Sequence, residues 1–281
     1  MLNCLKRLSY RPEPLKLAHR LGLNSILRRA YFYCARPISG ILQTEVAGIQ
    51  VQFYTHTPEE LRILESGGGA GGEERVLSRL IEFLRPADVV LDIGANVGLY
   101  TVFLAKVVGR GGLLIACEPS SQSYAHLLQN LELNGLTNVR CFRKALGERN
   151  GQAWLSWGEV IGGSSLVHAG EGDGPGEMVE VIEGDRLVSA ENLPVPRAVK
   201  IDVEGYEYAV IRGLRHTLAQ QACELVCCEV HPARLPREIK PETVLDLLES
   251  FGFSRIETYP RWDETIHLLA SKAAPLAEVR E

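Results

Sequence analysis

Short apolar runs alternate along the chain with longer segments whose apolar residues recur at helical spacing. The runs predict buried strands at 89–93, 113–117, 139–143, 198–203 and 225–230. The intervening and following segments predict helices over about 97–108, 121–134, 206–220 and 241–250. Repeated strand–helix units are typical of an α/β protein with a doubly wound parallel sheet and helices on both faces. The chain is expected to close with a hairpin that adds an antiparallel strand at the edge of the sheet, with strands at 253–259 and 265–270.

Residues 1–72 follow a different pattern and are expected to form a basic N-terminal extension. Residues 1–40 favour helices interrupted by prolines, and the alternation over 41–55 predicts a short hairpin. The glycine-rich stretch 66–72 predicts a flexible connector. The main domain is therefore expected over residues 73–281, beginning with a helix.

Residues 144–197 interrupt the alternation of strands and helices. They contain Trp154 and Trp157, and two stretches rich in glycine. A loose insertion at the carboxyl edge of a parallel sheet is expected to be either a lid over a substrate site or an ordinary surface loop.

Charge is distributed unevenly along the chain. The formal net charge is -5, yet the first 40 residues hold eight Lys or Arg and a single Glu, so the rest of the chain is strongly acidic. An acidic body argues against nucleic-acid binding, which requires a positive surface. The basic segment, interleaved with leucines, is compatible with peripheral contact with an anionic membrane or with a helical layer packed on the domain.

Hydrophobic residues make up 46% of the chain, enough for a folded core. The seven cysteines include no Cys-x-x-Cys pair, and several lie in apolar runs, which is typical of free thiols in a reducing compartment. No apolar stretch approaches the roughly 18 residues of a membrane span, and no signal peptide is evident. A cytoplasmic location is therefore expected.

The segment 88–98 carries the most chemical information. An apolar run ends at Asp92, and Gly94, Asn96 and Gly98 follow before a helical pattern begins. A strand, a tight turn and a helix build a nucleotide-type pocket at the carboxyl edge of a parallel sheet. The spacing is not the Gly-x-Gly-x-x-Gly of dinucleotide-binding turns, whose amides hold a pyrophosphate. A carboxylate before the turn would repel phosphate, and it suits a cationic ligand such as S-adenosylmethionine.

Glu118 directly follows the second strand, one strand–helix unit beyond Asp92. An acid in this position can accept the hydroxyls of a ribose, as in dinucleotide-binding folds. Glu118 therefore indicates a nucleoside ligand without distinguishing S-adenosylmethionine from a nicotinamide cofactor.

Further ionisable residues end the fourth and fifth strands. Period-two alternation places Lys200, Asp202 and Glu204 on one face at or beyond the end of the fourth strand, and Glu229 and His231 end the fifth. The carboxylates there could position a cofactor, act as a general base or bind a hard cation. His231 is either a base for a substrate hydroxyl or a hydrogen-bonded histidine at a strand end. No spacing specific to a metal site is present, so no metal is assigned.

Together these residues resemble the FkbM family of S-adenosylmethionine-dependent methyltransferases. The resemblance runs from about residue 74 to residue 232. It rests on the Val-Leu-Asp-Ile-Gly-Ala-Asn-Val-Gly run, Glu-Pro, Gly-Ser-Ser-Leu and Lys-Ile-Asp-Val-Glu-Gly-Tyr-Glu, at 90–98, 118–119, 163–166 and 200–207. It implies a class I methyltransferase (Rossmann-like) fold and transfer to a hydroxyl oxygen. The residues that it implies around the cofactor are Asp92, Gly94, Asn96, Gly98 and Glu118, with Asp202 where cofactor and acceptor meet.

The resulting hypothesis is an O-methyltransferase that acts on a hydroxyl of a sugar, glycolipid or secondary-metabolite acceptor. The acceptor proton would pass to His231 or to a carboxylate, Asp202 or Glu204. The alternatives are a methyltransferase for protein or nucleic acid, a nicotinamide-dependent oxidoreductase and a binding module that keeps the fold. The missing dinucleotide fingerprint counts against the oxidoreductase, and the absence of an Asn/Asp-Pro-Pro-Tyr/Phe turn counts against base-amino methylation.

Overall fold

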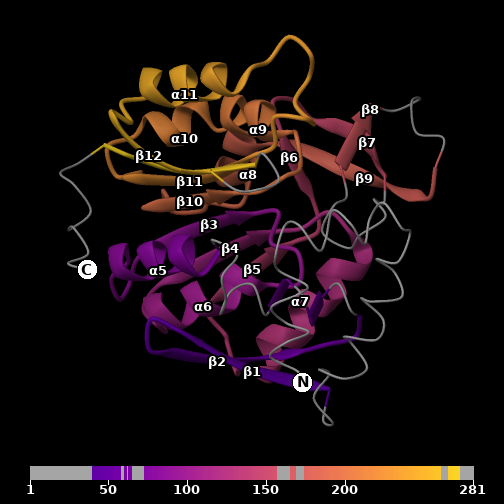
Figure 1. Ribbon diagram of the computed structural model, residues 1–281, viewed down its shortest axis with the longest axis vertical. Coiled ribbons are helices and arrows are strands. Elements are labelled where there is room, and N and C mark those ends of the chain that lie inside the picture. The colour runs from indigo at the N-terminus through magenta and orange to yellow at the C-terminus, as the bar shows by residue number, and fades with distance from the viewer. Residues whose placement is uncertain are drawn as a thin grey trace, which may run out of the picture.

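A seven-stranded sheet runs through the middle of the molecule (Figure 1). The computed structural model describes residues 40–57, 60–61, 63–64, 73–156, 165–168, 174–260 and 265–272. The expectations for residues 1–39 and for the glycine-rich connector lie outside this part of the chain. The strand order is β12-β13-β11-β10-β3-β4-β5, with bounds β3 Val89–Ile93, β4 Leu113–Cys117, β5 Val139–Phe142, β10 Ala198–Ile201, β11 Leu225–Val230, β12 Arg255–Pro260 and β13 Ile266–Ser271.

Neighbouring strands from β11 to β5 are parallel, whereas β13 is antiparallel to both β11 and β12. The predicted doubly wound, mostly parallel sheet with an antiparallel strand from the C-terminal hairpin is therefore confirmed. Within that hairpin, β13 pairs with β11 inside the sheet, and β12 pairs with β13 and forms the edge. Leu268, Leu269 and Ala270 of β13 are fully buried, whereas β12 carries Arg255 and Glu257, so the more apolar strand takes the inner position.

Helices cover both faces of the sheet (Figure 1). The helices α5 (Glu73–Phe83), α6 (Leu99–Val108) and α7 (Ser121–Leu133) lie on one face. The helices α8 (Gly184–Ala190), α9 (Glu207–Gly213), α10 (Arg215–Ala219) and α11 (Pro241–Ser250) lie on the other. Each face has its own hydrophobic cluster, which explains why successive side chains of β3 are buried on both sides. Among the helices described, none has the length and apolar character required to cross a membrane.

The predicted hairpin is present as β1 (Ile41–Val46) and β2 (Ile49–Tyr54). Its inward-facing Val46, Val51 and Phe53 join the same hydrophobic cluster as α5, α6 and α7. The side chains of Asn130 on α7 and of Asn134, which follows that helix, accept hydrogen bonds from the β2 backbone at 2.9 and 3.0 Å. The hairpin therefore packs as part of the main domain's core, over the helices (Figure 1).

The insertion at 144–197 is more regular than its glycine content indicates. Its described residues form a second, four-stranded sheet in the order β6-β9-β7-β8, followed by α8. The bounds are β6 Ala145–Gly147, β7 Gly151–Ser156, β8 Ser165–His168 and β9 Gly176–Glu183. Ala145, Ala153, Leu155, Val179 and Val181 bury a small core of their own. Apolar residues at every second position, at 153 and 155 and at 179 and 181, indicate these strands in the sequence. The glycines between the two segments made this pattern hard to recognise.

Candidate functional site

The turn between β3 and α6 packs closely against the backbone that follows the neighbouring strand β10. Gly94, Asn96 and Gly98 all have positive φ, at 76°, 51° and 95°. A Cβ atom on Gly94 would lie 1.8 Å from the backbone oxygen of Asp202, which follows β10. Only glycine therefore permits this approach, and the motifs after β3 and β10 become neighbours.

A cavity opens where these two turns meet the end of β4 and the second sheet. The open space at this place, including solvent at the mouth, is about 620 Å³. Five of the residues singled out from the sequence line it: Gly94, Asn96, Glu118, Asp202 and Glu204. Other lining residues come from the second sheet and the segment before it, namely Lys144, Ala145, Leu146 and Leu155.

Glu118 lies in the cavity wall with its carboxylate fixed by backbone donors. Its Oε1 accepts the N–H of Ser120 at 2.8 Å, and its Oε2 accepts the N–H of Asn96 at 2.8 Å. Burial raises the pKa of Glu118 to about 7, against the opposing effect of those two hydrogen bonds and of Lys200. Glu118 thus links the β3–α6 turn to the start of α7 and offers a carboxylate to a ligand in the cavity.

Asp92 occupies a different position from the other motif residues, because it lies behind the turn. Its side chain is 0% exposed, and it is absent from the cavity lining. Its Oδ2 accepts the hydroxyl of Thr101 at 2.6 Å, and its Oδ1 lies 3.3 Å from Lys200 Nζ. Gly98 is likewise outside the lining, where a Cβ would lie 2.7 Å from a methyl carbon of Leu127 on α7.

Lys200 of β10 is the cation around which this part of the site is organised. Its Nζ donates to the carbonyl oxygen of Gly94 at 2.8 Å and lies 3.6 Å from Asp202 Oδ2. Burial alone would lower the pKa of Lys200, but the charges of Asp92 and Asp202 raise it above its ordinary value. Lys200 therefore stays charged and holds the two turns in register. The sequence placed Lys200 on the same face as Asp202 without indicating this role.

Glu204 faces the cavity from a strained backbone position with a φ of 53°. Its Oε2 lies 3.2 Å from His231 Nε2 and pairs with the guanidinium of Arg234. Burial and the charge of Asp202 raise the pKa of Glu204 to about 7, while His231 and Arg234 oppose the rise. The residues that follow β10 and β11 therefore meet at this edge of the sheet.

His231 lies behind Glu204 and does not line the cavity. Its Nδ1 lies 2.8 Å from Oε1 of Glu207 at the start of α9, so carboxylates face both ring nitrogens. Burial alone would lower the pKa of His231, but the hydrogen bond to Glu207 and the charges of Asp202 and Glu204 raise it to about 9. His231 thus has a hydrogen bond at Nδ1 and an ion pair at Nε2.

Two groups of side chains in the described part of the chain have ligand atoms close enough to hold one metal ion. One is Asp202, Glu229 and His231, and the other is Glu73, Glu229 and His267. The first consists of residues that were singled out from the sequence at the ends of the fourth and fifth strands. The second includes Glu73 and His267, which sequence reasoning missed because they begin α5 and lie in β13, far apart along the chain.

The chain is similar to known methyltransferases. The model of the Methyltransferase FkbM domain family matches residues 92–255. The hexuronic acid methyltransferase AglP of Haloferax volcanii is 26% identical over 195 residues, which cover 69% of this chain and 76% of that protein. Methyltransferase 1 of Beauveria bassiana is 25% identical over 146 residues, covering 44% of this chain and 57% of that protein. Among solved structures, the precorrin-6y C5,15-methyltransferase of Geobacter metallireducens has a TM-score of 0.44 at 15% identity, covering 71% of this chain and 86% of that chain.

Proposed function

Since the chain belongs to the FkbM methyltransferase family, we propose that it methylates a hydroxyl group of a sugar, glycolipid or secondary-metabolite acceptor. The chain is an S-adenosylmethionine-dependent methyltransferase with the class I fold. The acceptor class is the proposed part. Transfer to a hydroxyl is supported by a cavity in which Gly94, Asn96 and Glu118 of the cofactor motifs meet the carboxylates Asp202 and Glu204, so that an acceptor hydroxyl would lie beside a candidate base.

The residues present fit S-adenosylmethionine. The cavity wall offers carboxylates and no glycine-rich phosphate cradle, which suits a nucleoside that carries a sulfonium and an ammonium group. The buried Oδ1 of Asn96 has no hydrogen-bond partner among the described residues, so a ligand donor would satisfy it. Glu118 would accept the ribose hydroxyls. Gly94, Asn96 and Asp202 would lie along the methionyl part, and the bound cofactor supplies an activated methyl group.

Asp92 and Gly98 contribute to this site indirectly in the proposal. Asp92 is held by Thr101 and Lys200, and Lys200 in turn holds the carbonyl of Gly94. A fixed carboxylate in this place would keep the turn and the local negative potential in position for a cationic ligand. Gly98 would let α6 start close to α7.

We assign the general base to Glu204, with His231 as the residue that positions it. Glu204 lines the cavity beside Asp202, whereas both nitrogens of His231 face carboxylates and leave no lone pair for an incoming proton. Glu204 would accept the proton of the acceptor hydroxyl as the oxygen attacks. A base whose pKa lies near neutrality is the most effective at neutral pH. The rest of the rate enhancement of methyl transfer would come from holding the cofactor and the acceptor close together and from excluding water.

A sugar acceptor is supported by the relative from Haloferax volcanii, whose name specifies a hexuronic acid. A cytoplasmic location and contact of the basic N-terminal residues with an anionic membrane remain proposals from sequence alone. Such contact would be useful for a glycolipid acceptor, whose sugar lies at the membrane surface.

Radiolabelled methyl transfer tests the proposed acceptor class. The full-length protein is incubated with methyl-labelled S-adenosylmethionine and with host fractions separated into glycan, lipid, small-molecule, protein and nucleic-acid pools. Label is expected in a glycan, lipid or small-molecule fraction. Label confined to protein or nucleic acid would contradict the proposal. Mild alkali then separates the products, because it releases a methyl ester and leaves the methyl ether of a hydroxyl acceptor intact.

A further inference from the structure

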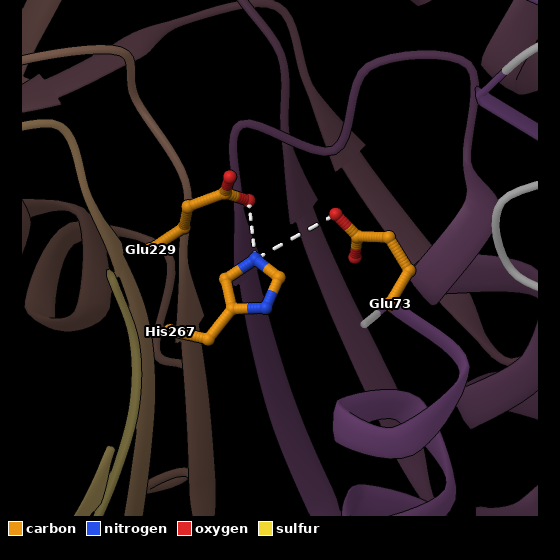
Figure 2. A group of neighbouring side chains, drawn as sticks. All are labelled: Glu73, Glu229 and His267. Carbon is orange, nitrogen blue, oxygen red and sulfur yellow. Dashed lines mark ion pairs between the residues drawn. The ribbon is translucent and has the colours of Figure 1, made fainter. Parts of the chain in front are cut away.

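Three ionisable side chains from distant parts of the chain converge beside the methyl-transfer site (Figure 2). Glu73 begins α5, Glu229 lies near the end of β11, and His267 lies in β13. His267 Nε2 is 2.8 Å from Oε2 of Glu229 and 3.6 Å from Oε1 of Glu73. Figure 2 shows both carboxylates directed at this nitrogen. One ligand atom from each residue lies within 4.8 Å of the others, as a shared cation requires.

The cluster is buried but reachable by a small ion. The side chain of His267 is 2% exposed, and each of the two carboxylates is 13% exposed. A divalent cation shared by the two carboxylates would offset the repulsion between them in this poorly solvated place.

We propose that Glu73, Glu229 and His267 bind one divalent transition-metal ion of the Zn²⁺ or Mn²⁺ class. An imidazole nitrogen with two carboxylate oxygens suits these metals, whereas Mg²⁺ and Ca²⁺ prefer oxygen ligands alone. Three protein ligands leave coordination positions for water. Tyr100 donates its hydroxyl to Oε2 of Glu73 at 2.6 Å and so fixes that carboxylate from outside the cluster.

The neighbouring group Asp202, Glu229 and His231 is a poorer site for the ion, although it shares Glu229. His231 Nδ1 is hydrogen-bonded to the buried Glu207, and its Nε2 lies closer to Glu204, at 3.2 Å, than to Glu229 of that group, at 3.7 Å. His267 differs because a single nitrogen faces the point where two carboxylates meet. An ion there would fix the start of α5 to β11 and β13, next to the loop that carries His231.

Metal stoichiometry of the full-length protein tests the site. Protein stripped with a chelator is titrated by calorimetry with Zn²⁺, Mn²⁺ or Co²⁺, and bound metal is counted after dialysis. One equivalent per chain is expected, with a rise in Tm of several degrees on metal addition. Co²⁺ should also give d–d absorption bands typical of a site with nitrogen and oxygen ligands.

Variants locate the ion. His267→Gln and Glu73→Gln should each lose the equivalent of metal and the metal-dependent rise in Tm, while circular dichroism and S-adenosylmethionine binding verify that they fold. His216→Gln, at an exposed histidine of α10, is the matched control and should retain the metal. His231→Gln should also retain it. The proposal is overturned if the native protein binds no metal, if both cluster variants keep it, or if His231→Gln alone abolishes binding. None of these readouts depends on methyl transfer, so failure here is separate from failure of the proposed acceptor.

Discussion

At the scale of single residues, Glu204 combines features expected of a reacting group. It lies in the cavity wall, its backbone has positive φ, and Arg234 and His231 hold one of its oxygens. A non-glycine residue in this conformation costs about 1–3 kcal/mol and persists only where the surroundings impose it. This strain therefore favours a functional position for Glu204.

Glu204→Gln is expected to reduce kcat by about 10²–10⁴-fold because the general base is removed. The Kd for S-adenosylmethionine should change little, since Gln keeps the shape of the side chain. Steady-state kinetics with saturating acceptor and calorimetry of cofactor binding measure the two effects. His231→Gln serves as the comparison and should cost about tenfold, the lower range for a positioning residue. An equal loss in both variants, or a greater loss in His231→Gln, would refute the assignment of the base.

The raised pKa of Glu118 predicts pH-dependent cofactor binding. Ribose hydroxyls donate to the ionised carboxylate, which is lost as the pH falls through about 7. Affinity for S-adenosylmethionine should therefore fall by about tenfold between about pH 8 and about pH 6. Binding measured across this range should lose that dependence in Glu118→Gln, whose affinity should be lower than that of the native protein at high pH. Parallel pH profiles for the two proteins would show that Glu118 does not contact the cofactor.

The raised pKa of Glu118 affects the stability of the folded protein in the opposite direction: stability falls as the pH rises. A pKa raised in the folded state means that folding favours the protonated form of Glu118. Its contribution to stability is fully present below the ordinary value of 4.5 and is lost as the pH rises to about 7. Cofactor binding and apo-protein stability are therefore expected to respond to pH in opposite directions at this residue.

At the scale of elements, the β3–α6 turn depends on its contact with the end of β10. Gly94→Ala would place a methyl group 1.8 Å from the carbonyl oxygen of Asp202 and would also strain a residue with φ of 76°. We expect a loss of stability of more than about 3 kcal/mol and weakened cofactor binding. Urea unfolding and calorimetry measure these effects.

Gly48→Ala is the matched control for that substitution. Gly48 has a φ of 79°, but nothing lies within 4 Å of an added Cβ. Gly48→Ala should lower the stability by about 1–2 kcal/mol, because alanine strains the backbone at positive φ, and it should leave cofactor binding unchanged. If the two variants are equally destabilised, steric contact between the β3–α6 turn and Asp202 is not what requires glycine.

Prediction of elements from sequence succeeded where one periodicity dominated. The runs at 89–93 and 113–117 coincide with β3 and β4, because strands covered on both faces are continuously apolar. The helix expected over 206–220 is divided into α9 and α10 at Leu214. In the second sheet, short strands separated by glycines gave too few repeats for alternation to be recognised, and their small core forms only when β7 and β9 pair.

At the scale of the whole molecule, the hairpin and the main domain form one hydrophobic core. Phe53 of β2 is 0% exposed, and its ring centroid lies 6.3 Å from that of Phe103 on α6. Phe53→Ala should therefore lower the free energy of unfolding of the entire structure by about 3–5 kcal/mol. A single unfolding transition at lower denaturant is expected by both tryptophan fluorescence and circular dichroism. A new early transition, with the main one unmoved, would mean that the hairpin unfolds as an independent unit.

The α/β class, the strands and helices of the central sheet and the resemblance to the family could be predicted from the amino-acid sequence, because they depend on side-chain periodicity and on motifs within one strand–turn–helix unit. The pairing of the charged residues depends on the folded structure. It placed Asp92 behind Lys200, turned both nitrogens of His231 toward carboxylates, and brought Glu73 and Glu229 to His267. Such pairings join residues far apart in the chain, and their pKa values depend on burial that exists only once the layers have packed.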